Sequence, residues 1–160
     1  MMKRFVNIFV AAAFVLGLAA SCEKAPSLAE GIVAEWQLTE MTDYEASALP
    51  SIYIEFTADL NFVIYQKVGE VARYRKYDGT YAIDGTVISG KYSDGEDWGS
   101  SYRAAFEADG DVLVMTAFTT EKDGTVTEGE VLKYVKASLS QEEKDAADVV
   151  TKSEDSVRFL

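Results

Sequence analysis

Two arginines and a tyrosine alternate in the stretch "VARYRKY", as Arg73, Arg75 and Tyr77. Alternate residues of a β-strand point to the same face, so an extended chain places these three side chains together. A guanidinium group binds carboxylates and phosphates well, and inside a protein it needs such a partner to offset its lost hydration. The spacing predicts a site for an acidic group if this face points inward. A bulge at Asp78-Gly79 would instead turn both arginines outward, toward neighbouring carboxylates.

The chain has few of the residues that common catalytic and metal sites require. The chain has no histidine and a single cysteine, which excludes imidazole bases, histidine metal ligands and Ser-His-Asp triads. The 27 acidic residues include no pair that a motif singles out, and there is no glycine-rich phosphate loop. The acidic loop "SDGEDWG" lacks the ligand spacing of a calcium loop, so we interpret it as a solvated turn. We predict a protein that is not an enzyme and has no cofactor or metal.

The single cysteine, Cys22, follows a leader. "MMKR" is basic, the next stretch of about 15 residues is apolar, and small residues precede the cysteine. This order is typical of a secretory signal peptide, because the apolar core is short for a membrane span. We predict a signal peptide over residues 1–21.

The ending "LAASC" resembles the lipobox of bacterial lipoproteins, with Ala19 where that family prefers Leu. The resemblance implies that Cys22 becomes the first residue of the mature protein and carries a diacylglyceryl group and further acylation, such as palmitate. Several acyl chains hold a protein firmly on a membrane. Glu23 follows the cysteine, and in related lipoproteins this favours the outer membrane, on the periplasmic side or the cell surface. The alternative is an ordinary signal peptide that leaves a free thiol.

Charge narrows the range of partners. The chain carries 27 acidic and 15 basic residues, and loss of the leader removes Lys3 and Arg4. Nucleic acid and anionic lipid would both repel such a protein. We therefore expect no nucleic-acid partner and a membrane attachment through lipidated Cys22, with residues 22–30 as a tether.

The rest of the chain predicts strands. Eight segments with alternating or β-rich apolar residues are separated by short turns, and no helix lies between them. Such a meander removes its exposed edges by closing on itself. We predict an all-β fold, an eight-stranded antiparallel up-and-down β-barrel over residues 31–136, that is monomeric. The segments are "IVAEWQLTEM", "SIYIEFTAD", "NFVIYQKV", "EVARYRKYDGTYAID", "TVISGKYS", "SYRAAFEA", "DVLVMTAFTTE" and "VTEGEVLKYVKA".

Alternation along these segments predicts which side chains line the interior. A barrel of eight strands is the size at which these side chains either fill the interior or leave room for one small ligand. The predicted lining residues are Ile52, Ile54, Phe56, Phe62, Ile64, Tyr81, Tyr92, Tyr102, Phe106, Val112, Val114 and Phe118.

Residues 31–136 resemble the lipocalin-like lipoproteins of Gram-negative bacteria, in the lipocalin and fatty-acid-binding superfamily. The similarity lies in "AEWQL", in the hairpins "YIEFTADLNFVIY" and "GTYAIDGTVIS", and in "DVLVMT". It implies a barrel closed at one end with Trp36 packed in its floor, although Ala34 replaces the family's usual glycine. Fatty-acid-binding relatives hold the ligand's acidic head with an arginine and tyrosine clamp, on a different strand from Arg73 and Arg75.

Residues 137–160 change in character. "SLSQEEKDAADVV" starts with Ser140 and has Glu143 three residues later, a capping box that predicts a helix from about 141 to 150. The ending "VRFL" either packs Val157, Phe159 and Leu160 against the barrel or forms a disordered tail.

Two functional hypotheses follow. In the first, the anchored barrel binds a small apolar or amphiphilic ligand, using Arg73, Arg75 and Tyr77 for an acidic head and the aromatic lining for its body. In the second, the barrel is a filled, non-catalytic scaffold of the cell envelope that docks a protein or a glycan through its surface.

Overall fold

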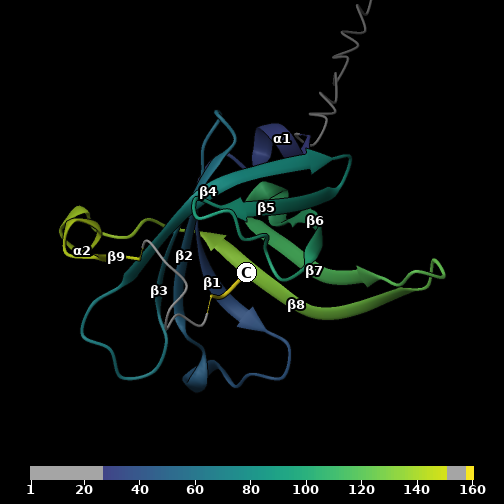
Figure 1. The fold of residues 1–160 in the computed structure, drawn as a ribbon. Helices are drawn as coiled ribbons and strands as arrows, with labels where there is room; N and C mark the ends of the chain where they lie inside the picture. The colour runs from purple at the N-terminus through teal and green to yellow at the C-terminus, as the bar shows by residue number, and fades with distance from the viewer. Residues whose placement is uncertain (1–26, 151–157) are drawn as a thin grey trace, which may run out of the picture.

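A computed structural model describes residues 27–150 and 158–160. Its core is a ring of eight antiparallel strands in sequence order, in which β3 pairs with β4 and β1 pairs with β8. Figure 1 shows the strands around one interior. The predicted eight-stranded up-and-down barrel is thus confirmed. The strands are β1 Glu35–Met41, β2 Ser51–Phe56, β3 Asn61–Lys67, β4 Arg75–Asp84, β5 Val87–Tyr92, β6 Ser101–Glu107, β7 Val112–Thr120 and β8 Val126–Lys136.

Alternation determines which face of each strand is buried. In β2 the residues Ile52, Ile54 and Phe56 are almost completely buried, while the residues between them are half-buried. The short hairpin to β3 places Phe56 opposite Phe62 without a register shift. The two aromatic rings therefore enter the interior together, as the period of two requires.

The ring has one weak seam, between β5 and β6. These strands pair only at Val87 with Arg103 and at Ile88 with Tyr102. The loop of residues 93–100 bridges the gap, and its Trp98 is buried against the backbone of Gly90. A side chain larger than hydrogen at Gly90 would meet the indole, so this glycine lets Trp98 close the seam.

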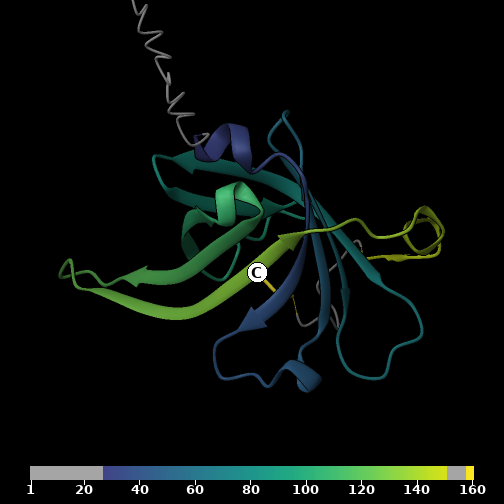
Figure 2. The ribbon, with the colours of Figure 1, turned by 180° about the vertical axis from the view of Figure 1, so that it is seen from behind.

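A hairpin of β7 and β8 extends past the rest of the barrel, as Figure 1 and the reverse view in Figure 2 show. β7 pairs with β6 only as far as Phe118, and β8 pairs with β1 only as far as Leu132. The hairpin continues to the pair Thr120 and Val126. Two short 3-10 helices, η1 Ala46–Ala48 and η2 Ala108–Gly110, lie in the loops before β2 and β7.

The C-terminal helix is shorter than the predicted 141–150. Helix α2 spans Gln141–Asp145, and the Ser140 hydroxyl accepts a hydrogen bond from the Glu143 amide at its start. The chain then forms β9, Asp148–Val149, parallel to the start of β4. Amides of Asp148 and Val150 donate to the carbonyls of Tyr74 and Lys76. These sheet hydrogen bonds end the helix early because they require extended backbone.

A small second core holds α2 to the outside of the barrel. Tyr65, Tyr74 and Leu139 are buried there. Lys144 of α2 donates to Glu35 at 2.8 Å and lies 3.5 Å from Glu55, on the neighbouring strands β1 and β2. The Leu139 amide donates to the other oxygen of Glu35.

The N-terminal part begins with helix α1, Leu28–Gly31, whose residues 28–30 belong to the predicted tether. Trp36 is fully buried near it and donates from its indole nitrogen to the Ile32 carbonyl at 2.9 Å. The predicted signal peptide, 1–21, and lipid attachment at Cys22 lie outside the described residues. In the described part of the chain, no helix has the length and apolar character needed to cross a membrane.

Candidate functional site

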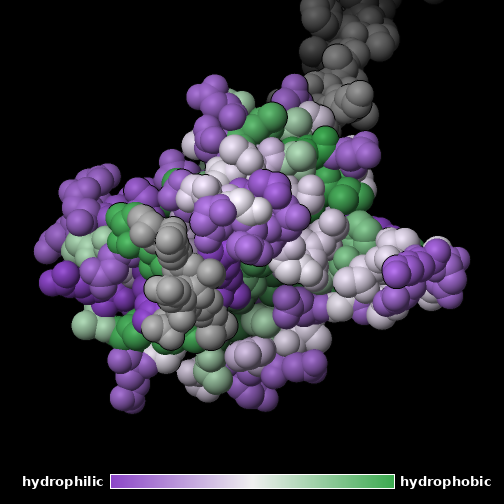
Figure 3. Space-filling model, in the orientation of Figure 1, coloured by the Kyte–Doolittle hydropathy of each residue, from purple (hydrophilic) through white to green (hydrophobic). Residues whose placement is uncertain are grey.

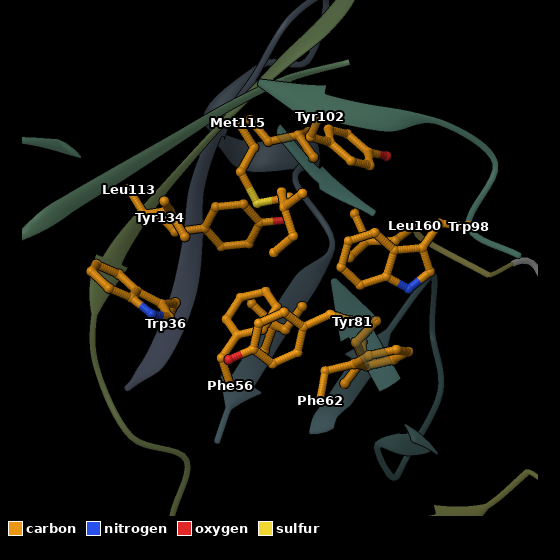
Figure 4. Packing of buried hydrophobic residues seen from close by; sticks show 14 of the residues in the cluster. Trp36, Phe56, Phe62, Tyr81, Trp98, Tyr102, Leu113, Met115, Tyr134 and Leu160 are labelled. Carbon is orange, nitrogen blue, oxygen red and sulfur yellow. The ribbon is translucent and has the colours of Figure 1, made fainter. Parts of the chain in front are cut away.

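The barrel interior is lined with aromatic rings arranged around Trp98. Its indole contacts Phe56, Phe62 and Tyr102 edge-on, with ring centroids 6.5, 5.1 and 6.1 Å apart. Figure 4 shows the side chains of Phe56, Phe62, Trp98 and Tyr102 directed into one interior. Edge-to-face contacts of this kind add to the stabilisation that burial provides. The interior of the described barrel is therefore packed by rings that converge from β2, β3, β6 and the 93–100 loop.

Most of the predicted lining residues lie in this interior. Phe56, Phe62, Tyr77, Tyr81 and Tyr102 are each exposed by less than 5%. Phe106 is half-buried on the inward face of β6, and its ring stacks on Trp36 with centroids 6.0 Å apart. Trp36 thus packs inside the barrel near the start of β1, where it also contacts Ile32, the residue after α1.

Phe118 lies on the outer face, contrary to the predicted lining. The inward residues of β7 are Leu113, Met115 and Ala117. Phe118 instead lies 4.7 Å from the Arg103 guanidinium on the outside. Val112 and Val114 share this outer face. "VLVMTAF" has apolar residues at both parities, so its alternation does not determine which set points inward.

The two arginines of "VARYRKY" are separated by the start of β4. The β3–β4 register is continuous from Arg75 to Thr80, with no bulge at Asp78-Gly79. Arg75 therefore has the same inward parity as Tyr77 and lies opposite the buried Gln66. Arg73 precedes the strand, is exposed, and forms a 3.7 Å ion pair with Asp148. Only Arg75 and Tyr77 remain together as a candidate polar site inside the barrel.

Several polar atoms are buried among these rings. The Tyr81 hydroxyl donates to the Thr57 carbonyl, and the Tyr92 hydroxyl donates to the Leu160 carbonyl, each at 2.8 Å. The hydroxyls of Tyr77 and Tyr134 and the indole nitrogen of Trp98 have no hydrogen-bond partner in residues 27–150 and 158–160. Burial raises the pKa of Tyr92 to about 12 and also raises the pKa of Tyr102 and Tyr134. These phenols are therefore neutral donors at physiological pH.

Comparison with known families agrees with this geometry. A family model described as a lipocalin-like domain matches residues 32–143. The chain belongs to the lipocalin-like family. A similar solved structure is a complex of bovine odorant binding protein with a selenium-containing odorant, at 14% identity, covering 78% of this chain and 82% of that chain with a TM-score of 0.40. Comparison with curated proteins finds no match.

Sequence reasoning missed two members of this lipocalin-like interior and one contact within it. Trp98 was assigned to a polar loop, Tyr134 was not assigned to a face, and the contact between Tyr92 and Leu160 was not foreseen. A large aromatic residue within an otherwise polar loop is the signal that could have found Trp98, which packs on Gly90 of the preceding strand. Tyr134 shares a parity with Leu132 in β8, and both are fully buried. No local pattern indicates the contact with Leu160, which lies 68 residues from Tyr92.

The last described residues of this lipocalin-like chain pack onto the barrel. Leu160 is buried in the main core, and Phe159 packs against that core. Arg158 forms an ion pair with Asp94, which lowers the pKa of that carboxyl. Phe159 and Leu160 of "VRFL" therefore pack against the barrel, the first of the two predicted alternatives. Val157 lies outside the described residues.

Two aspartates of the acidic loop form ion pairs with basic side chains of the protein. Asp94 pairs with Arg158, and Asp97 pairs with Lys91 at 2.8 Å. Beside this loop a pocket of about 440 Å³ opens at the β5–β6 seam. Its lining is mixed: serine, threonine and charged side chains lie beside the aromatic rings of Tyr81 and Trp98. It is lined by Thr80, Tyr81, Ala82, Ser89, Gly90, Lys91, Asp97, Trp98, Ser100 and Ser101.

Proposed function

We propose that this lipocalin-like protein binds one small apolar or amphiphilic molecule inside its barrel and does not act on it chemically. The aromatic interior suits an apolar body, because apolar burial is the main source of ligand affinity in such sites. The family membership supports the barrel as the binding element.

One observation carries the proposal, namely the buried donors that lack a partner among the described residues. A buried polar group without a hydrogen bond is costly, by about 1–3 kcal/mol. Three such groups, the hydroxyls of Tyr77 and Tyr134 and the indole N–H of Trp98, lie in one apolar interior. A ligand with an oxygen acceptor would satisfy a donor that the described protein leaves unsatisfied, which makes acceptor-bearing apolar molecules the favoured class.

An acidic head is proposed to lie near Arg75 and Tyr77. Their side chains share the inward face of β4, two residues apart. A guanidinium group adds a charge-assisted hydrogen bond to a carboxylate, and these are about twice as strong as neutral ones. Fatty acids and similar amphiphiles have this combination of head and body.

The test is a titration with cis-parinaric acid, a fluorescent fatty acid, compared with its methyl ester. We expect R75Q to weaken binding of the acid about tenfold and of the ester little, because only the acid carries a charge for the guanidinium group. R73Q is the matched control, since Arg73 lies on the outer surface. Absence of saturable binding of either probe to the unaltered protein would refute the function.

Attachment to the outer membrane through lipidated Cys22 is also part of the proposal. The lipobox-like "LAASC" supports it, and the acidic charge favours a covalent anchor over electrostatic attachment. Replacement C22S should release the protein from membranes and remove the added lipid mass. An unchanged mass and distribution in C22S would contradict the anchor.

A second function, docking of an envelope protein, is favoured by the β7–β8 hairpin. Beyond Phe118 and Val131, its two outer edges have no partner strand within the described residues. Free edges can add a strand from another chain. Figure 3 shows that the tip of this hairpin is hydrophilic, so pairing there would depend on backbone hydrogen bonds. Deleting residues 121–125 and testing ligand binding and partner capture separately distinguishes the two functions.

A further inference from the structure

The last described residue of the chain, Leu160, occupies space inside the barrel. Leu160 is only 5% exposed and belongs to the same buried cluster as Trp98 and Tyr92, and Phe159 packs against this cluster. Figure 4 includes Leu160 among the rings of the interior. These residues are not part of any barrel strand, so the barrel's hydrogen-bonded wall does not depend on them.

Tyr92 is the main contact of this tripeptide, Arg158–Leu160. Its hydroxyl donates to the Leu160 carbonyl at 2.8 Å, and its ring lies 4.4 Å from the Arg158 guanidinium. Arg158 also forms an ion pair with Asp94, two residues after Tyr92. Tyr92 at the end of β5 and Asp94 just after it thus hold the tripeptide by a hydrogen bond, a cation–π contact and an ion pair.

The part of the tripeptide that enters the barrel has the chemistry of an amphiphile. It is a branched apolar side chain next to a carbonyl oxygen, with the side chain among aromatic rings and the oxygen on a phenol hydroxyl. The phenol of Tyr92 is a neutral donor, so it can donate to an ester, ketone, amide or carboxylate oxygen.

We propose that the tripeptide Arg158–Leu160 occupies the ligand site and that the ligand binds by displacing it. The proposed ligand is an apolar molecule with a carbonyl or carboxyl oxygen, which accepts from Tyr92 while its body takes the place of Leu160. This rests on the proposed ligand-binding function. Beyond that function, it specifies the position of the ligand and the segment that the ligand must displace.

Competition of this kind lowers the apparent affinity of the site. The observed dissociation constant is the intrinsic one divided by the fraction of molecules whose site is open. If the tripeptide occupies the site in about nine molecules of ten, its removal should tighten binding about tenfold. Removing only the ion pair between Arg158 and Asp94 should tighten binding by a smaller factor.

The experiment compares binding of cis-parinaric acid to four chains: the full chain, a chain lacking residues 158–160, R158Q and R103Q. R158Q removes the ion pair with Asp94. R103Q is the matched control, because Arg103 forms a comparable arginine–carboxylate pair with Glu128 on the outer surface. We expect binding about tenfold tighter in the shortened chain, an intermediate gain in R158Q and no change in R103Q. An added Arg-Phe-Leu peptide should weaken binding to the shortened chain competitively.

Equal binding to the full and shortened chains would overturn the proposal and leave the ligand-binding function intact. Absence of binding to every chain would instead refute the ligand-binding function, and this proposal with it. If the shortened chain does not fold, judged by circular dichroism, R158Q decides: a gain over R103Q supports displacement, and equal binding overturns it.

Discussion

The hydroxyl of Tyr92 donates a 2.8 Å hydrogen bond to the carbonyl oxygen of Leu160, 68 residues away along the chain. This contact joins the end of β5 to a segment that follows all eight barrel strands. It places a backbone acceptor inside an aromatic barrel, in the position that we propose for an acceptor on the ligand. The hydrogen bond therefore connects the stability of the barrel to the proposed binding of a ligand.

Replacing Tyr92 with phenylalanine tests this hydrogen bond. The ring and its contact with Phe62 remain, while the Leu160 carbonyl loses its donor. We expect Y92F to lower the free energy of unfolding by about 1 kcal/mol, measured by urea titration. Y44F is the control, because Tyr44 is half exposed on the surface. Equal stability of Y92F and Y44F would contradict a stabilising role for the bond.

The seam between β5 and β6 depends on Gly90 and Trp98. A Cβ at Gly90 would lie 2.1 Å from the Trp98 ring, so the ring must move in G90A. We expect G90A to lower the free energy of unfolding by about 2 kcal/mol in urea titration, as overpacking usually does. G99A is the control, since a Cβ there meets no atom within 4 Å.

A double variant identifies the cause of that loss. In W98A the indole that clashes with the new methyl group is gone, so G90A should cost much less in that background. If the two losses of stability simply add, the clash between Gly90 and Trp98 is not the cause.

Lys144 attaches α2 to the barrel. It donates to Glu35 at 2.8 Å, and the Glu35 side chain is only 9% exposed. We expect K144M to lower the free energy of unfolding by about 1–3 kcal/mol, between the values for exposed and buried ion pairs. K133M is the matched control, since its pairs with Glu40 and Glu107 are longer and more exposed. A loss in K133M as large as that in K144M would contradict this role.

Buried phenols make the protein sensitive to alkali. Burial raises the pKa of Tyr92 from 10.0 to about 12, so above pH 10 the unfolded chain loses a proton that the folded chain keeps. The stabilisation from Tyr92 is complete below pH 10 and is lost as the pH rises toward 12, by about 2–3 kcal/mol. Tyr102 and Tyr134 are shifted in the same direction.

The measurement is the ultraviolet absorbance of phenolate during an alkaline titration, followed together with circular dichroism. We expect part of the phenolate signal to appear only as the fold is lost. A titration in which all tyrosines ionise near pH 10 with the fold intact would contradict the burial of these side chains.

The strands were predictable because their alternation is local. Ile52, Ile54 and Phe56 form one face in the sequence and one buried face in the structure. β7 was harder, since "VLVMTAF" is apolar at both parities and only pairing with β6 and β8 determines that Leu113 and Met115 point inward. Phe118 was consequently placed on the wrong face.

The candidate site was predictable only in part. Tyr77 and Tyr81 follow from the period of β4, but the exclusion of Arg73 depends on where that strand begins. Helix α2 ends before residue 150 because pairing with β4 competes with helix propensity, and this pairing is not visible locally. The contacts of Trp98 and Leu160 depend on a loop and a terminal segment that enter the barrel from outside its strand pattern.

Native mass spectrometry of the protein purified from its own cells tests the central claim most directly. A ligand-binding barrel predicts a non-covalent small molecule, at most one per chain, that denaturation releases and that bound cis-parinaric acid replaces. A chain that carries only its covalent mass under native conditions, and gains none after incubation with cis-parinaric acid, would contradict the claim that this barrel binds small molecules.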